Sequence, residues 1–505
     1  MSFPNALLAA RHHLVVILGL LTAAVLASRL ELPSREASPP LPSGEIPAPR
    51  RGALLEEETR WARAAWRYFQ RNCQDETGLA NAADGRPVTT LWDTGSYLLA
   101  MISAYRLGVI DRVEFDQRLG RALNALARIA LFQGELPNRF YHTETLAMAD
   151  AEGQPSEQGV GWSAVDIARL LVPLHIIVWN YPGHAAEASA VVRRWRLDRL
   201  VREGVLTGAA VDAPGQVDYP QEGRGGYEAY AAKAMALLGS GVSTGPYGYA
   251  KVQGVRVPID QRPPEKSSSR NYTVGEPYIL EGLEFGWDRS GREDAWRIFR
   301  AQENRFKATG KLTAASSGQV DEAPYFVYNT VYAKAKPWQT LTVDAKDAAP
   351  FRFLSAGDAV AWYALYDADY SRQLADKAAS LFDPEQGWYG GWYESMERPN
   401  RAMSVNTNAM VLEALHYRQF GALVAVYAPT EHAESPAAAL PSAERGGDAK
   451  TARLKPAVQS GPGRQAKDGH ARTRKVKGSS SASRASAKQG SKSRESGAKP
   501  AKKHR

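Results

Sequence analysis

A helical spacing of apolar residues, repeated from about residue 54 to residue 425, constrains the fold more than any other feature. Segments such as "LLEEETRWARAAWRYFQRN", "LWDTGSYLLAMISAYRLGVI" and "SAVDIARLLVPLHIIVW" place apolar side chains three and four positions apart, the pattern of amphipathic helices. Glycine, proline and asparagine cluster between these segments, where turns are expected. About a dozen helices in this length give helical hairpins of about 60 residues, too long for short solenoid repeats.

This pattern predicts an all-α fold, an (α/α)6 toroid with long loops at one mouth. A plain helical domain stays open, because no repeat is visible at the level of single residues. The helical spacing extends to "DEAPYFVYNTVYAKA" (321–335). Strand-like alternation is rare, and its best case is "YAKVQGVRVPID" (249–260), which predicts a hairpin on a long loop.

The composition divides the chain into four parts. Residues 1–29 contain the apolar run "LVVILGLLTAAVLAS" after Arg11, which predicts a signal peptide or an uncleaved signal anchor in the inner membrane. Residues 30–53 form a Pro-rich linker, and 54–428 are the helical domain. Residues 429–505 are poor in aromatic side chains and rich in Ala, Ser, Lys and Arg, as in disordered basic tails. We therefore expect a protein of the periplasm or cell envelope.

The net charge of +9 belongs to the tail. Residues 436–505 carry 18 Lys and Arg against four acids, a balance of +14, which leaves −5 for the rest of the chain. The tail suits anionic envelope polymers or no partner at all, and we expect no specific nucleic acid. The single cysteine, Cys73, excludes an intrachain disulfide. The few histidines lack the spacing of zinc sites, so we expect neither a metal nor a cofactor.

The loops between the predicted helices carry the unusual residues. Nearly every one combines Trp or Tyr with Asp, Glu or Asn and a glycine, as in "TTLWDTGS", "PQEGRGGYE", "RNYTVGEPY" and "GWYGGWYE". Aromatic rings stack on the apolar faces of sugars, while acids and amides bond their hydroxyls. The loops therefore predict a saccharide site. Its predicted binding residues are Trp92, Asn138, Tyr141, Trp162, Arg224, Tyr227, Tyr272, Glu322, Tyr325, Trp388, Trp392, Glu394, Asn406 and Asn408.

Four acids are the candidate catalytic residues, and two have structural alternatives. Asp93 precedes Thr94 and could cap a helix over 96–107. Asp166 follows Ser163 in an S-x-x-D capping pattern. Glu222 lies too far upstream of the next helix to cap it, which favours a functional role. Glu276 directly precedes Pro277 at a helix start, where the helix dipole favours the ionised form and suits a base.

Other acids and aromatic residues favour structural roles. Glu281 and Glu284 lie inside an amphipathic helix and are expected on a solvated or paired face. Asp321 or Glu322, before Pro324, is expected to start a helix. Trp61, Trp66, Trp179 and Trp362 fall on helical faces and are expected in the core. Asn406 and Asn408 have helix capping as an alternative to sugar binding.

Several motifs in order, "GVGWSAVDIARLL", "QEGRGGYEAYAAKA", "NYTVGEPYILEGLEFG", "APYFVYNTVYA" and "NTNAMVLEALHYR", resemble the glucoamylase-like domain family of unknown function 3131. The resemblance covers nearly all of 55–425. It implies an (α/α)6 toroid related to bacterial β-1,2-glucanases, with Asp93, Asp166, Glu222 and Glu276 lining a sugar cleft. "SAGDAVA" (355–361) departs from the pattern expected for the family.

The resulting prediction is an exported or membrane-tethered glycoside hydrolase that acts on a bacterial glucan, with β-1,2 linkage and inversion implied by the resemblance. Hydrolysis needs a protonated acid and a second carboxylate, for which we take Glu222 as the acid and Glu276 as its partner, with Asp93 and Asp166 as alternates. A non-catalytic glycan-binding or scaffold subunit of an exopolysaccharide assembly system is the alternative. An isoprenoid-type toroid enzyme is disfavoured because no DDxxD run occurs.

Overall fold

The computed structural model describes residue 41 and residues 44–213, 215–263 and 270–425. The predicted apolar segment at 14–28 and the predicted basic tail lie outside these residues. None of the described helices is both long enough and apolar enough to span a membrane. Residues 44–53, the described end of the predicted linker, contain no helix or strand and are followed by α2 (Glu56–Asn72).

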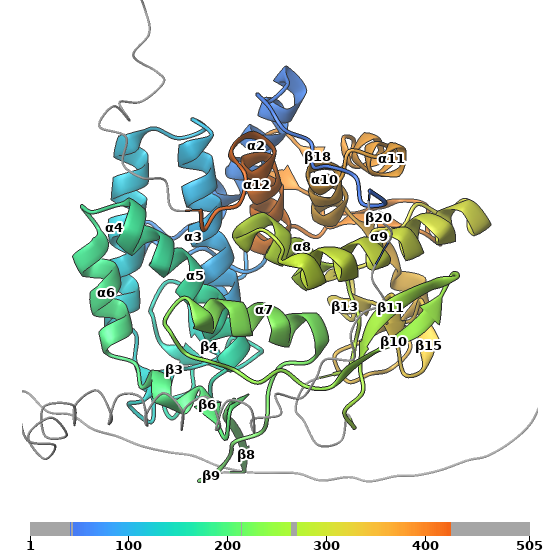
Figure 1. Ribbon diagram of the computed structural model, residues 1–505. Helices are drawn as coiled ribbons and strands as arrows, with labels where there is room; N and C mark the ends of the chain where they lie inside the picture. The colour runs from blue at the N-terminus through green and yellow to red at the C-terminus, as the bar shows by residue number, and fades with distance from the viewer. Residues whose placement is uncertain (1–40, 42–43, 214, 264–269, 426–505) are drawn as a thin grey trace, which may run out of the picture. The chain divides into compact units, whose positions relative to one another are not determined.

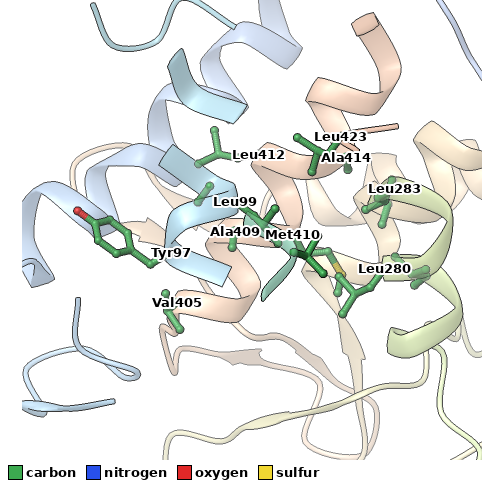
Figure 2. Packing of buried hydrophobic residues seen from close by; sticks show 14 of the residues in the cluster. Tyr97, Leu99, Leu280, Leu283, Val405, Ala409, Met410, Leu412, Ala414 and Leu423 are labelled. Carbon is green, nitrogen blue, oxygen red and sulfur yellow. The ribbon is translucent and has the colours of Figure 1, made fainter. Parts of the chain in front are cut away.

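Six helical segments contact one another in a closed ring, which we call the inner ring. In ring order these are α3 (Leu91–Arg106), α5 (Ala164–Asn180), α7 (Gly225–Ala236), α8 (Glu276–Leu280) with its π-helical continuation η3 (Glu281–Phe285), α10 (Ala356–Leu365) and α12 (Val405–Phe420). In α3, α5, α10 and α12 most residues are buried on every side, as expected for helices with apolar residues all around. Side chains of α3, α12 and the α8–η3 segment, such as Leu99, Met410 and Leu280, meet inside the ring (Figure 2).

The outer layer alternates with the inner ring along the chain. It consists of α2, α4 (Arg112–Arg128), α6 (Ala185–Arg193), α9 (Arg289–Thr309) and α11 (Asp369–Ala378). Figure 1 shows α4 and α6 beside α3 and α5. Between α7 and α8 the chain forms an antiparallel hairpin instead of an outer helix, β10 (Tyr247–Val252) and β11 (Val255–Asp260), which packs on α9 and α7. The hairpin predicted at 249–260 is confirmed.

Short antiparallel strands occupy the connections, so the fold is a helical toroid with many small sheets and the expectation of an all-α chain is not confirmed. Three-stranded sheets are formed by β1 (Val88–Thr90), β4 (Phe140–His142) and β5 (Met148–Ala149), by β12 (Ser317–Gln319), β13 (Phe326–Asn329) and β16 (Thr340–Leu341), and by β17 (Phe353–Ser355), β20 (Gly391–Tyr393) and β21 (Pro399–Asn400). Two-stranded ribbons are formed by β2 (Leu131–Phe132) with β3 (Leu136–Pro137), β6 (Val201–Arg202) with β7 (Val205–Leu206), β8 (Ala210–Ala213) with β9 (Gln216–Asp218), β14 (Tyr332–Ala333) with β15 (Lys336–Pro337), and β18 (Phe382–Asp383) with β19 (Gly387–Trp388). The part of the chain that the structure describes also contains two 3₁₀ turns, η1 (Leu197–Arg199) and η4 (Ala349–Phe351).

The helix predicted across 321–335 is wrong, because this segment holds β13 and β14. Its aromatic and β-branched residues favour strands, and Phe326 to Tyr328 pair with β12. No helix begins near Pro324 either, and Asp321 and Glu322 both form ion pairs with Arg398. The helix expected from residue 96 begins at Leu91 instead, with Thr90 as its N-cap.

Of the four tryptophans expected in the core, Trp61, Trp66 and Trp362 are buried. Trp179 is 65% exposed, which corrects the prediction made for it. It is the penultimate residue of α5, where the helix reaches the surface. Glu281 and Glu284 are paired as expected, with Lys233 and Arg169 respectively.

Candidate active site at the N-terminal ends of the inner helices

The inner helices present acids in their first turns, at one end of the ring. Four of them begin with a hydroxyl residue that accepts a hydrogen bond from the backbone N–H three positions on. The pairs are Thr90 with Asp93, Ser163 with Asp166, Ser355 with Asp358, and Ser404 with Thr407. The same local arrangement therefore places an aspartate at the third position of α3, α5 and α10. Together with Glu222 and Glu276 these aspartates form a group that we call the acid ring.

Asp93 is held from two directions. Its Oδ2 accepts hydrogen bonds from the backbone N–H and hydroxyl of Thr90, and its Oδ1 accepts one of 2.8 Å from Nδ2 of Asn406. Burial raises the pKa of Asp93, and the hydrogen bonds from Thr90 oppose this. Asp93 is therefore a capping-box residue at the start of α3 that also joins α3 to α12 at the mouth.

Glu276 is the first residue of α8, and its Oε2 accepts hydrogen bonds from the hydroxyls of Tyr227 and Ser317. Burial raises its pKa, while the bond from Tyr227 and the charge of Arg169 lower it. The net shift is upward, whereas we expected the helix start to favour the ionised form. Both hydrogen bonds that Glu276 makes with described residues reach Oε2, which leaves Oε1 for water or a substrate.

Glu222 caps a helix, although not the one that follows it in sequence. Its Oε2 accepts a hydrogen bond from the N–H of Ala164, the first residue of α5, and its Oε1 lies 3.5 Å from a guanidinium nitrogen of Arg139. The carboxylate fits closely, because a Cβ added at Gly208 would lie 2.9 Å from Oε2. Sequence distance hid this role, since the loop that carries Glu222 reaches α5 only in the folded chain.

Asp166 lies near the charge of Glu222, in an environment that favours its protonated form. Burial raises its pKa to about 7, and the charges of Glu222 and Asp93 add to the shift, while that of Arg139 opposes it. A carboxyl group with a pKa near 7 holds a proton over part of the neutral range, as a general acid must. The S-x-x-D pattern is confirmed as a cap by Ser163, which accepts a hydrogen bond from the backbone N–H of Asp166. This cap uses the backbone of Asp166 and leaves its carboxyl group near the charges of Glu222 and Asp93.

Asp358 is an acid that the sequence reasoning did not select. Burial raises its pKa to about 7, and the charge of Glu276 contributes. Its Oδ1 accepts a hydrogen bond from Ser355, and its Oδ2 has no hydrogen-bond partner among the described residues. "SAGD" at 355–358 repeats the hydroxyl-x-x-Asp pattern of 90–93 and 163–166, so this spacing could have identified Asp358.

Aromatic side chains border the acid ring. The ring of Trp92 packs edge-on against Tyr227 at 5.6 Å between ring centres, and Tyr227 holds Glu276. Tyr328 stacks edge-on with Tyr272 at 5.2 Å. Burial raises the pKa of Tyr328, and the charges of both Glu276 and Asp166 add to it, so Tyr328 lies near two members of the acid ring.

Most of the remaining predicted sugar contacts are occupied by the protein itself. Asn138, Tyr141, Trp162, Trp388 and Asn408 are buried, and each has hydrogen bonds to the backbone. Trp388, for example, donates to the carbonyl of Trp61 and packs edge-on against its ring. These side chains shape the loops behind the mouth and have no free face for a sugar.

The other predicted contacts are charged pairs or surface rings. Arg224 pairs with Asp260, Glu394 with Arg305, and Glu322 with Arg398. Trp392 lies under the ammonium group of Lys377 at 3.3 Å, and Tyr325 is 65% exposed. Asn406 alone among the predicted amides contacts the acid ring, through Asp93.

A separate pocket lies between α7, the β10–β11 hairpin and α9, in the place of the missing outer helix. Tyr247, Tyr278, Glu281 and Asp294 are among its lining residues, and no member of the acid ring is. Within the described ranges, no group of three or more His, Cys, Asp or Glu side chains is arranged to hold a metal ion.

Several solved structures share the fold of this chain. A "putative glucoamylase" from Bacteroides caccae has a TM-score of 0.53 at 15% identity, over 73% of this chain and 94% of that one. A second, from Bacteroides fragilis, has a TM-score of 0.52 at 13% identity, over 76% and 94%. An endo-β-1,2-glucanase from Chitinophaga pinensis, in complex with sophorotriose and glucose, has a TM-score of 0.51 at 12% identity, over 74% and 94%. At such identities the likeness shows the fold alone.

A comparison with curated proteins found no match. The model of a family described as "Protein of unknown function (DUF3131)" matches residues 60–421. That range spans the helical body from the first outer helix to the last inner one and includes every member of the acid ring. The chain therefore belongs to the DUF3131 family.

Proposed function

We propose that this protein is a glycoside hydrolase that acts on a bacterial glucan. The observation that carries the proposal is the acid ring, in which five carboxyl groups from separate segments of the chain gather at one mouth beside Trp92 and Tyr227. Hydrolysis of a glycosidic bond requires two carboxyl groups with different proton affinities. A protein that only binds glycans has no need of such a group.

Asp166 is the proposed general acid and Glu276 the proposed base. Burial and the charge of Glu222 raise the pKa of Asp166 to about 7, so Asp166 holds a proton over part of the neutral range. At Glu276 the hydrogen bond from Tyr227 and the charge of Arg169 oppose the effect of burial on the pKa, and both hydrogen bonds reach Oε2, which leaves Oε1 for a water molecule. Glu222, our first choice for the acid, accepts hydrogen bonds at both oxygens, which suits a carboxylate that does not release a proton to a substrate. Its proposed role is to hold the proton on Asp166 through its negative charge.

The proposed substrate is a β-1,2-linked glucan. The similarity in fold to the Chitinophaga pinensis endo-β-1,2-glucanase supports this linkage. The acid ring supports an uncharged polysaccharide, since its excess of carboxyl groups would repel an anionic one. Inversion at the anomeric carbon is the expected outcome. Proton NMR during the reaction tests it, because it identifies which anomer of the product forms first.

The site of action is proposed to be outside the cytoplasm, with the chain exported or tethered by the apolar sequence at 14–28. Cell fractionation and protease accessibility in intact spheroplasts test this part. Recovery of the full chain in the cytosolic fraction would contradict it without affecting the proposed chemistry.

The test of the activity is release of reducing sugar by the purified chain from a panel that includes β-1,2-, β-1,3- and α-1,4-glucans. The parent should hydrolyse at least the β-1,2-linked polymer, and Asp166→Asn and Glu276→Gln should each lower kcat by about a thousandfold or more. Binding of the panel without hydrolysis would favour the alternative, a glycan-binding subunit of an exopolysaccharide assembly system.

A further inference from the structure

Arg169 lies inside the inner ring, one helical turn after Asp166 on α5, and is 2% exposed. It binds side chains of four other inner segments. Its Nε donates to Ser96 of α3 at 3.1 Å, and its Nη1 donates to Tyr230 of α7 at 3.0 Å and to Glu284 of η3 at 2.6 Å, while Nη2 donates to Glu413 of α12 at 3.4 Å. A guanidinium group is rigid and planar, so these contacts fix its orientation.

One chain of contacts leads from Arg169 to Asp93. The Ser96 hydroxyl that accepts from Arg169 donates to Oδ1 of Asn406 at 2.7 Å. This bond sets the orientation of the amide, whose Nδ2 then donates to Oδ1 of Asp93. The same Ser96 hydroxyl also lies within hydrogen-bond distance of the carbonyl of Trp92, at 3.2 Å, so it has two acceptors to choose from. The hydrogen bond from Arg169 fixes the position of the Ser96 oxygen between these acceptors, and in this way Arg169 supports the contact between Asn406 and Asp93.

A second chain of contacts leads from Arg169 to Glu276. The guanidinium carbon lies 4.6 Å from the ring centre of Trp92, a cation–π contact. The ring of Trp92 packs against Tyr227, and Tyr227 donates to Glu276. The ring of Trp92 also packs against Tyr230, which is buried and itself accepts a hydrogen bond from Arg169. We therefore expect a displaced guanidinium to shift the Trp92 ring and with it the hydroxyl that holds Glu276.

Two buried glutamates face Arg169 inside the ring, Glu284 in the π-helical segment at 2.6 Å and Glu413 on α12 at 3.4 Å. π-helical turns are frequent at functional sites. Burial and the charge of Glu284 raise the pKa of Glu413 well above its ordinary value, and the charge of Arg169 opposes this shift. The charge of Arg169 lowers the pKa of both Asp93 and Glu276.

We propose that Arg169 is the positioning residue of the acid ring. It fixes Asp93 through Ser96 and Asn406. It fixes Glu276 through Trp92 and Tyr227. The expected change in kcat rests on the proposed function. The expected displacement of Asn406 and Trp92 rests on the contacts alone. A residue that only joined the inner helices would contribute to stability and leave turnover unchanged.

The test compares R169K with R106K. Arg106 is a matched control, since it lies at the opposite end of the inner ring and joins Tyr181, His416 and the carbonyl of Leu423. Lysine keeps the charge but cannot reach four partners at once. R169K should lower kcat on β-1,2-glucan by about 30- to 100-fold with KM changed less than about threefold, as small misplacements of reacting groups do. R106K should lower Tm and leave kcat unchanged well below Tm.

Crystal structures of the parent and R169K provide a readout that does not need activity. The Asn406 amide or the Trp92 ring should be displaced in R169K. The proposal would be overturned if both groups kept their positions and kcat were unchanged. If the parent hydrolyses no glucan, the proposed function is wrong. The positions of Asn406 and Trp92 in R169K would still test the positioning role of Arg169. If R169K does not fold, S96A removes the first chain of contacts alone and should release Asn406 from Asp93, whereas an unmoved Asn406 would overturn the proposal.

Discussion

Replacing Glu222 by glutamine separates two roles that this residue can have. In the folded chain the pKa of Asp166 rises from 3.8 to about 7, a change of about 3 units or roughly 4 kcal/mol. Burial is the largest cause and Glu222 the second. A neighbouring like charge typically accounts for about 1 unit, or about 1.4 kcal/mol. Arg139, freed from its ion pair, would lower the pKa of Asp166 further, so both effects have the same sign.

The expected result is a shifted pH profile. Asp166 must be protonated to act as the acid, so the alkaline limb of kcat/KM should lie near pH 7 in the parent and near pH 6 in E222Q. Glutamine can still accept from the N–H of Ala164, so α5 keeps its cap. Activity at pH 5 should stay within about threefold of the parent, because Asp166 is protonated there in both forms.

The assay is the initial rate of sugar release from β-1,2-glucan between pH 4 and pH 9. E322Q is the control, because Glu322 is an exposed acid paired with Arg398 and the substitution is the same. E322Q should leave the profile unchanged. A folded E222Q that is inactive at every pH would show that Glu222 itself is the acid, and an unshifted alkaline limb would show that its charge does not act on Asp166.

Further substitutions test other parts of the site and core. Y227F removes a hydrogen bond that lowers the pKa of Glu276, so the acidic limb of the pH profile should move to higher pH by up to about 1 unit. D358N removes a buried acid whose pKa of about 7 lies above its unfolded value. The parent therefore loses stability as pH rises from about 4 to 7. The free energy of unfolding of D358N minus that of the parent, measured by urea unfolding, should increase by up to about 4 kcal/mol between pH 4 and pH 8. A difference that does not change with pH would contradict the raised pKa of Asp358. W388A should lower the free energy of unfolding by about 3–5 kcal/mol, since the side chain is fully buried. Y325A should change it by less than about 0.5 kcal/mol and raise KM only if this exposed ring contacts glucan.

Local patterns in the sequence were sufficient for most of the helices, although not for every starting point, since α3 begins at Leu91 rather than at residue 96 and the segment 321–335 holds strands. The apolar spacing of 91–106, 164–180 and 405–420 describes helices buried on several sides, and S-x-x-D at 163–166 names a cap that the structure confirms. The hairpin at 247–260 also follows from alternation over a few residues. These features depend on neighbours within about four positions, which a sequence displays directly.

Only the tertiary structure decided which acids meet and what surrounds them. Glu222 caps a helix that begins 58 positions before it, and Asn406 reaches Asp93 across 313 positions. Trp388 and Trp392 stand in the same glycine-rich loop, yet one is core and the other lies near the surface under Lys377. Contacts and burial of this kind arise when distant segments pack. The proton affinities of Asp166 and Asp358 depend on that burial and on the charges it brings close, and the sequence alone does not contain them.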